Sequence, residues 1–251
     1  MGKNSTFRGR DGCAYRMERK TIIAEKRKGQ KEMGSNSAEN RITAYLDQLI
    51  VRYPALEEQK KSILKAYLLM EECYNSGGKL LIAGNGGSAA DSEHIVGELM
   101  KGFKKARRVG TEVKQKLSGI NMQRGNLLGE KLQGGLPAIA LTGHSALSSA
   151  YANDESPECV YAQQLYGYGN KGDVFLGIST SGNAENVMNA AVVAKAKGLY
   201  VIGLTGVDGG ELGRFADVAV KVPAYETYQI QELHLPVYHC LCMMLEERFF
   251  G

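Results

Sequence analysis

The sequence predicts an α/β protein: a three-layer αβα sandwich on a five-stranded parallel sheet, preceded by N-terminal helices. Two observations support this fold class. Within 251 residues, several short segments are continuously apolar over the length of a strand, and segments with helical periodicity alternate with them. Strands buried on both faces have this composition when helices cover a parallel sheet. Right-handed crossovers then distribute the helices over both faces.

The predicted elements follow in chain order. Two helices are expected before the sheet, at 38–53 and 55–76, with Pro54 between them and Gly77-Gly78 at the end. Strands are expected at 79–83, 136–142, 173–178, 200–205 and 218–222. Helices are expected at 89–102, 145–152, 157–166, 184–197 and 229–248.

Two segments of the chain are strongly basic. Residues 1–32 carry ten Lys/Arg against four Asp/Glu, and residues 101–131 carry nine against two, which leaves the remainder acidic. Residues 1–36 show no sustained period, so we expect a disordered extension, within which Met33 is a candidate initiator. The domain is expected over 37–251. Its Gly-rich segment 104–134 is interpreted as an inserted loop with at most a short helix.

Composition excludes several classes of protein. No apolar run reaches the roughly 18 residues needed to cross a bilayer, and the N-terminus lacks the apolar core of a signal peptide. A cytoplasmic protein is therefore expected. Its five cysteines have no metal-knuckle spacing and are interpreted as free thiols. The basic segments contain few aromatic residues and no nucleic-acid motif, so they are interpreted as solvated.

Two strand–turn–helix units predict a phosphate-binding site. Gly84-Asn85-Gly86-Gly87-Ser88 joins the first strand to a helix, and Ser179-Thr180-Ser181-Gly182-Asn183 does so after the third. Hydroxyl groups and backbone N–H groups at a helix N-terminus bind phosphate well. The first turn also fits the dinucleotide pattern G-x-G-x-x-A. The acidic residue expected after the second strand is missing, however, since Thr142-Gly143-His144 stands there.

The helix after the first turn carries two polar residues on one face. His94 and Glu98 are four residues apart in an otherwise apolar segment. Each has an ordinary interpretation as a solvated or paired side chain. A carboxylate and an imidazole close to a phosphorylated ligand would also supply a general base and a general acid.

Four motifs in order resemble the sugar isomerase (SIS) domain, and within it the phosphoheptose isomerases. They are Gly84–Ser88, Gly177–Asn183, Leu204–Gly210 and Ile230–His234. The resemblance covers roughly residues 38–249. It implies a homotetramer that converts a phosphosugar, most simply sedoheptulose 7-phosphate, through an enediol for the synthesis of nucleotide-activated heptose.

The resemblance also implies roles for individual residues. Glu98 and His239 correspond to the catalytic acid/base pair. A zinc site corresponds to His94, Glu98, Gln231 and His239, although Gln231 and His239 lie about 12 Å apart along a straight helix. Substrate and phosphate contacts correspond to Asn85, Gly86, Gly87, Ser88, Asn153, Asp154, Ser179, Thr180, Ser181 and Gln231.

The chain departs from the family pattern at three places. Ala184 stands where many members have serine, Tyr228 stands where an aspartate contacts substrate, and the 104–134 segment is longer than usual. Two alternatives therefore stay open. One is a non-catalytic SIS-fold protein that binds a replication initiator, and the other is an isomerase or sensor for another phosphosugar. Retention of Glu98 and His239 favours the enzyme. A membrane or nucleic-acid partner is not expected.

Overall fold

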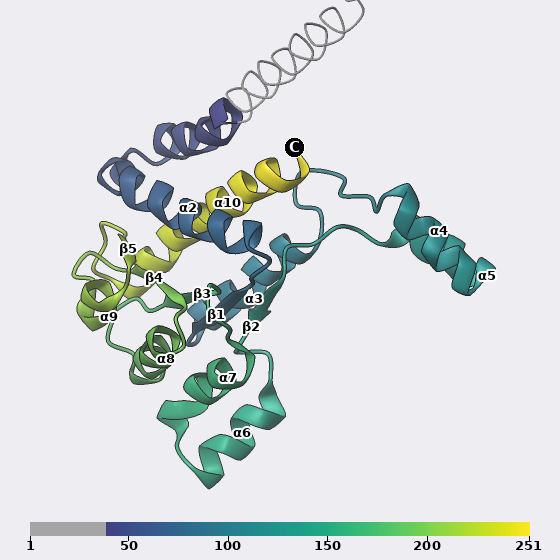
Figure 1. Ribbon diagram of the computed structural model, residues 1–251. Coiled ribbons are helices and arrows are strands. Elements are labelled where there is room, and N and C mark those ends of the chain that lie inside the picture. The colour runs from purple at the N-terminus through teal and green to yellow at the C-terminus, as the bar shows by residue number, and fades with distance from the viewer. Residues whose placement is uncertain (1–38) are drawn as a thin grey trace, which may run out of the picture. The chain divides into compact units, whose positions relative to one another are not determined.

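The computed structural model describes residues 39–251, of which Ile42–Gly251 form one compact unit. The extension expected over 1–36 lies outside the described residues. Five parallel strands form one sheet in the order β2-β1-β3-β4-β5 (Figure 1). Their bounds are β1 Leu80–Gly84, β2 Ala138–Ala140, β3 Val174–Ile178, β4 Tyr200–Thr205 and β5 Val218–Lys221. The predicted five-stranded parallel sheet is therefore confirmed.

Helices occupy the connections between strands. A helix covers residues 39–52, and a 3-10 turn, η1 (Pro54–Gln59), precedes α2. Proline at the start of η1 lacks the N–H that would continue the preceding helix, as the sequence predicted. The others are α2 Lys60–Asn75, α3 Gly87–Met100, α4 Thr111–Ile120, α5 Met122–Lys131, α6 Ser145–Asp154, η2 Pro157–Cys159, α7 Val160–Tyr168, α8 Glu185–Ala196, α9 Gly210–Phe215 and α10 Thr227–Phe250.

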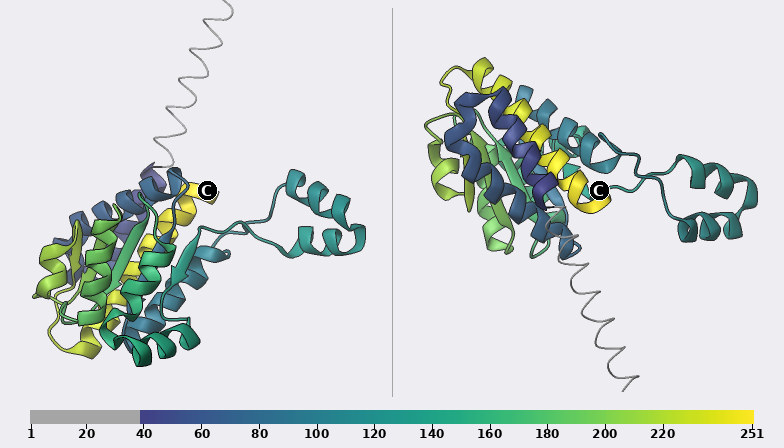
Figure 2. Two further views of the ribbon diagram at one scale, coloured as in Figure 1. Left: turned by 60° about the horizontal axis from the view of Figure 1, so that its bottom comes forward. Right: turned by 90° about the horizontal axis from the view of Figure 1, so that it is seen from above.

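Alternate residues of the strands face two separate hydrophobic cores. In β1, Leu80 and Ile82 belong to one core, whereas Leu81 and Ala83 belong to the other. The first core is completed by α2, α3, α10 and residues 42–50, and the second by α7, α8 and α9. This alternation is the period of two that a sheet covered on both faces requires. The three layers are visible in Figure 2.

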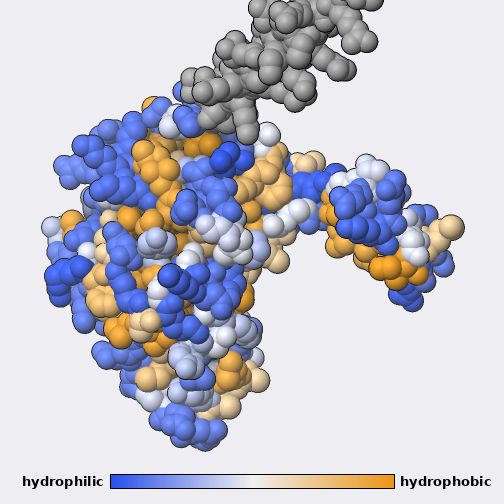
Figure 3. Space-filling model, in the orientation of Figure 1, coloured by the Kyte–Doolittle hydropathy of each residue, from blue (hydrophilic) through white to orange (hydrophobic). Residues whose placement is uncertain are grey.

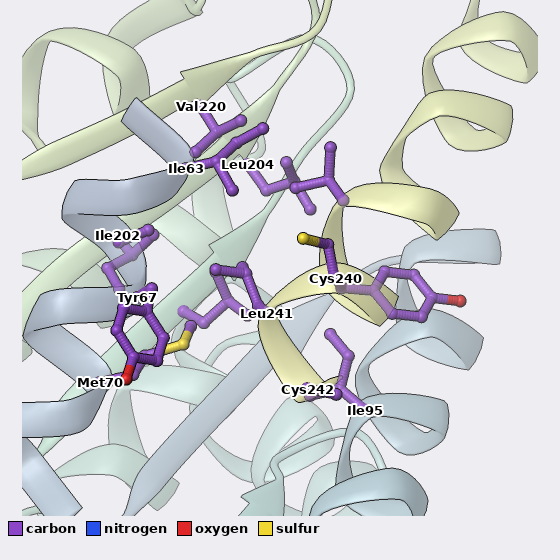
Figure 4. Close-up of a cluster of buried hydrophobic side chains, with 14 of the residues drawn as sticks. Ile63, Tyr67, Met70, Ile95, Ile202, Leu204, Val220, Cys240, Leu241 and Cys242 are labelled. Atoms are coloured by element: carbon purple, nitrogen blue, oxygen red, sulfur yellow. The ribbon is translucent and has the colours of Figure 1, made fainter. Parts of the chain in front are cut away.

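The first core fixes α10 against the sheet and against α3. Leu241 and Cys242 of α10 are buried together with Ile95 of α3 and Met70 of α2 (Figure 4). These contacts hold one face of α3 against α10 along several turns. Any polar residue on those facing surfaces is therefore brought into a shared, partly desolvated space.

The segment 104–134 differs from its prediction as a loop. Helices α4 and α5 form an antiparallel hairpin, whose stem is closed by a bridge between Arg108 and Gln133. The two helices approach so closely at Gly125 that a Cβ there would collide with the Leu117 carbonyl, and glycine permits this approach because it has no Cβ. No residue of α4 is buried, and apolar side chains lie exposed along the hairpin (Figure 3). Without a buried stripe, the sequence pattern gave no sustained helical signal.

The short helix α9, six residues long, was also absent from the sequence prediction. Most other boundaries agree with the predictions to within about two residues, the usual uncertainty of helix ends. Strand β2 is shorter than expected. Across residues 39–251, no helix combines the length and apolar composition needed to cross a bilayer.

Candidate active site

The two predicted phosphate loops lie at the carboxyl ends of neighbouring strands. β1 and β3 pair in parallel, so the turns that follow them leave the same edge of the sheet side by side. The strand order reverses at this pair, because β2 lies on one side of β1 and β3 to β5 lie on the other. Ligands in open α/β sheets bind at such a switch point.

The first loop brings a helix N-terminus up to Gln231 of α10. Gly86 has a positive φ of 57° and precedes α3, which has no side-chain cap. Ser88, in the first turn, is almost fully buried. A Cβ at Gly87 would lie 2.5 Å from Gln231 Nε2, so a larger residue at this position would displace the Gln231 side chain. The first turn of α3 and a side-chain amide of α10 therefore meet at one place.

The second loop is folded by its own hydroxyl groups. The Ser179 hydroxyl accepts a hydrogen bond from the Gly182 backbone N–H at 3.1 Å, and the Ser181 hydroxyl accepts from Asn183 N–H at 3.2 Å. Each hydroxyl keeps its own proton to donate to an anion. Helix α8 begins at Glu185, and its N-cap, Ala184, offers no side-chain cap.

A pair of asparagines ties the two loops together. Asn85 Nδ2 donates to Asn186 Oδ1 at 2.8 Å, and Asn186 Nδ2 donates back to Asn85 Oδ1 at 3.0 Å. The hydroxyl of Tyr161 also donates to the carbonyl of Gly84 at 2.8 Å. Sequence reasoning included Asn85 but missed Asn186 and Tyr161, whose roles depend on the pairing of β1 with β3.

The second part of the site lies farther along α3. His94 Nε2 is 3.5 Å from Glu98 Oε1 and 3.5 Å from His239 Nε2, so α3 and α10 bring these three predicted residues together. Glu98 Oε2 is 3.4 Å from Lys101 Nζ. Burial lowers the pKa of His239, and the neighbouring His94 lowers it further, whereas Glu98 opposes the shift. The His239 imidazole is therefore mainly neutral at neutral pH.

Tyr238 and Asp91 adjoin this cluster. The Tyr238 hydroxyl lies 3.0 Å from His94 Nδ1 and 3.1 Å from Asp91 Oδ1. Burial raises the pKa of Asp91, while the Tyr238 hydrogen bond and His94 act against the shift. Sequence reasoning missed both residues. Asp91 is one helical turn before His94, a spacing that could have indicated it, whereas no pattern indicated Tyr238.

The stem of the hairpin closes the cluster from another side. The Phe103 ring lies 5.4 Å from the His239 ring, centroid to centroid. Glu246 accepts hydrogen bonds from the backbone of Phe103 at 2.8 Å and from buried Arg107 Nε at 2.8 Å. Arg107 also donates to the carbonyl oxygen of Glu98 at 3.0 Å. This buried ion pair fixes the stem on the two helices that carry the cluster.

A zinc ion would find part of its ligand set in this cluster. Two ligands on a tetrahedral zinc are about 3.3 Å apart, close to the separations of His94 Nε2 from His239 and Glu98. Within the described residues, no three His, Cys, Asp or Glu side chains are yet arranged as a complete site. Gln231 lies instead at the first loop, against Gly87. The donor chemistry fits zinc, but the side chains would have to close around it.

The remaining predicted residues are not joined to either loop. Asn153 and Asp154 end α6, and the side-chain hydrogen bond of Asn153 goes to Asp154 at 2.9 Å. In the part of the chain that the structure describes, no hydrogen bond links this pair to the phosphate loops. Tyr228 is 60% exposed in the first turn of α10.

Comparison with known proteins identifies a family. The family model "SIS domain" matches residues 44–121 and 124–206. The chain is 39% identical over 179 residues to a phosphoheptose isomerase of Aneurinibacillus thermoaerophilus, covering 71% of this chain and 77% of that protein. It is 39% identical over 193 residues to one from a Nitratiruptor species, covering 77% of this chain and 89% of that protein.

Solved structures agree with this result. A phosphoheptose isomerase from Neisseria gonorrhoeae aligns with a TM-score of 0.59 and 32% identity, over 82% of this chain and 97% of that one. One from Francisella tularensis aligns with a TM-score of 0.62 and 29% identity, with the same coverage. The chain belongs to the SIS domain family, among the phosphoheptose isomerases.

Proposed function

We propose that this protein is an aldose–ketose isomerase that converts sedoheptulose 7-phosphate into D-glycero-D-manno-heptose 7-phosphate through an enediol. The observation that carries the proposal is the arrangement of α3, with an uncapped phosphate loop at its N-terminus and a carboxylate with two imidazoles near its other end. A protein that only bound a partner would have no need for this second group.

The length of α3 supports a long phosphosugar. The backbones of Ser88 and Glu98 are ten residues apart in one helix, which is about 15 Å. An extended chain advances about 1.2 Å per bond, so the eight bonds from C1 to phosphorus of a 7-phosphate span about 10 Å. The side chains of Ser88 and Glu98 bridge the rest. A three-carbon phosphosugar would reach only one of the two groups.

The chemistry follows from the cluster. The Glu98 carboxylate removes a proton from C1 of the ketose, and the electrons form the C1–C2 double bond of the enediol. Neutral His239 takes the proton of the C1 hydroxyl and delivers it to the C2 oxygen. Glu98 then returns its proton to C2, which gives the aldose. Each group ends in its starting state, as general acid–base catalysis requires.

We further propose zinc at His94, Glu98 and His239, with Gln231 as the fourth candidate ligand. When bound, it would polarise the substrate carbonyl as a Lewis acid. A preparation that is fully active after chelation and dialysis, with no metal found by elemental analysis, would exclude a catalytic zinc.

A homotetramer is also proposed. Large apolar side chains on the helical layer that contains α2 and α10 are exposed, including Val51 at 79%, Leu68 at 50% and Leu235 at 40%. A symmetric contact between copies would cover them. Light scattering should give the mass of four chains, and a monomer at micromolar concentration would contradict the proposal.

The function is tested by incubation with a panel of phosphosugars. We expect sedoheptulose 7-phosphate to yield an isomer of equal mass, identified by NMR, and shorter ketose phosphates to bind with little turnover. Binding of every member without conversion would favour the alternative of a sensor. No binding at all would favour the SIS-fold protein that acts through a protein partner.

A further inference from the structure

The residues next to the catalytic cluster form a chain of hydrogen bonds that no part of the proposed reaction uses. Asp91 and His94 lie on α3, three residues apart, and Tyr238 reaches between them from α10. The tyrosine oxygen is 3.1 Å from Asp91 Oδ1 and 3.0 Å from His94 Nδ1. Both separations are those of ordinary hydrogen bonds, so the phenol contacts both partners at once.

Counting protons shows which group donates each of these hydrogen bonds. A tyrosine hydroxyl has one proton to donate, and an ionised carboxylate can only accept. Tyr238 therefore donates to Asp91. Its oxygen can then only accept from the other side, which requires a proton on His94 Nδ1. In its neutral form the His94 imidazole carries one N–H, and Nε2 then holds a lone pair.

That lone pair is directed at the reacting groups. His94 Nε2 is the atom that lies 3.5 Å from both His239 Nε2 and Glu98 Oε1. An unprotonated Nε2 can accept a hydrogen bond from His239 or bind a cation. A protonated Nε2 could do neither, and it would instead donate to Glu98 and weaken that group as a base.

We propose that Tyr238 and Asp91 are positioning residues that hold His94 in the Nδ1-protonated tautomer. Neither residue touches the substrate in this proposal, which rests on the proposed function only for its effect on turnover. The geometry of α3 against α10 is enough for the tautomer itself. Asp91 depends on Tyr238, because its Oδ2 is buried without a hydrogen-bond partner among residues 39–251 and the Tyr238 hydroxyl supplies the hydrogen bond that its Oδ1 receives.

The experiment compares two Tyr→Phe variants. Tyr238→Phe removes the hydroxyl that contacts both Asp91 and His94. The control, Tyr74→Phe, removes another largely buried hydroxyl, which donates to the Pro137 carbonyl at 3.2 Å. Protein labelled with [15N]histidine contains four such residues, and the His94 signals are those missing from a His94→Asn protein. The 15N shifts report which ring nitrogen carries the proton, independently of activity.

We expect His94 of the wild type and of Tyr74→Phe to be protonated at Nδ1 alone. In Tyr238→Phe we expect a mixture of tautomers, a kcat about 10–100-fold lower and an unchanged KM, because the phosphate loops are untouched. Asp91→Ala should reproduce this result by a different deletion.

A wild-type His94 protonated at Nε2 would overturn the proposal. It would mean that Asp91 carries a proton and donates to Tyr238, which in turn donates to His94 Nδ1. An unaltered tautomer in Tyr238→Phe would overturn it as well. If the tautomer is as expected but no phosphosugar is isomerised, the proposed function fails and the positioning role of Tyr238 stands.

Discussion

The two ends of α3 carry different kinds of residue, and the proposed function gives them different tasks. At its N-terminus, glycines and a small hydroxyl residue lie beside the second loop, to which the Asn85–Asn186 pair links them. Farther along, the helix presents titratable side chains, His94 and Glu98, to α10. In the proposed function the loop end binds the phosphate and the other end moves protons. Binding and turnover should therefore be separable by mutation.

The largest expected effect is at the proton-transfer end. Glu98→Gln should lower turnover by at least about 100-fold, because a general base contributes roughly 10²–10⁴. Its affinity for the phosphosugar, measured by calorimetry, should stay close to that of the wild type. If affinity falls in step with turnover, the two ends of α3 do not act separately.

The second effect is at the loop end. Ser179→Ala combined with Thr180→Ala should weaken binding of the phosphosugar by about 2–4 kcal/mol, taking about 1–2 kcal/mol for each hydrogen bond to a charged group. Ser118→Ala, which removes an exposed hydroxyl on the α4–α5 hairpin, is the matched control. Equal affinities of the double variant and the control would show that the phosphate binds elsewhere.

A third effect concerns His234, which lies on α10 between Gln231 and His239. Its side chain is fully buried, and burial lowers its pKa from 6.5 to about 4, with the Thr205 backbone opposing the shift in part. Below pH 6.5 the unfolded chain binds a proton that the folded chain does not. The free energy of unfolding should therefore be highest above about pH 7 and about 2 kcal/mol lower at about pH 5.

Thermal unfolding at about pH 7.5 and about pH 5 measures this loss. His234→Leu should make the difference smaller, and His144→Asn should leave it unchanged. A wild-type protein that is equally stable at both pH values would contradict the buried, neutral state of His234 between the two ends of the site.

The smallest expected effect is an increase in stability and in affinity for the phosphosugar. Ala184 is the N-cap of α8 and offers no side-chain hydrogen bond. Ala184→Ser should stabilise the protein by about 1 kcal/mol and supply one more hydroxyl at the phosphate loop. Affinity should increase while kcat stays the same. A change in kcat with no change in affinity would mean that the second loop takes part in proton transfer.

The sequence predicted the features that depend on residues close together in the chain, and it missed those that depend on packing between distant elements. Buried strands were predictable because their composition is local, and β4 begins and ends where expected. The loop residues and the His94/Glu98 pair were predictable because turn chemistry and helical spacing are local too. The α4–α5 hairpin was not, since its helices bury no apolar stripe.

Residues that act across elements were beyond sequence reasoning. Asn186 meets Asn85 only because β1 pairs with β3, and Tyr238 meets Asp91 only because α10 packs on α3. Phe103 contacts His239 because Glu246 and Arg107 fix the hairpin stem. The resemblance assigns Gln231 both to the metal and to the substrate, and along α10 it lies against Gly87 at the loop end of the site.

The most direct test of the separation between binding and proton transfer is isomerisation of sedoheptulose 7-phosphate in D₂O, followed by NMR. The wild type should introduce deuterium at C1 of the ketose and C2 of the aldose and at no other carbon. Glu98→Gln should bind the sugar and introduce none. Deuterium appearing at the wild-type rate in Glu98→Gln, or a wild type that binds the sugar and exchanges no proton, would contradict this account.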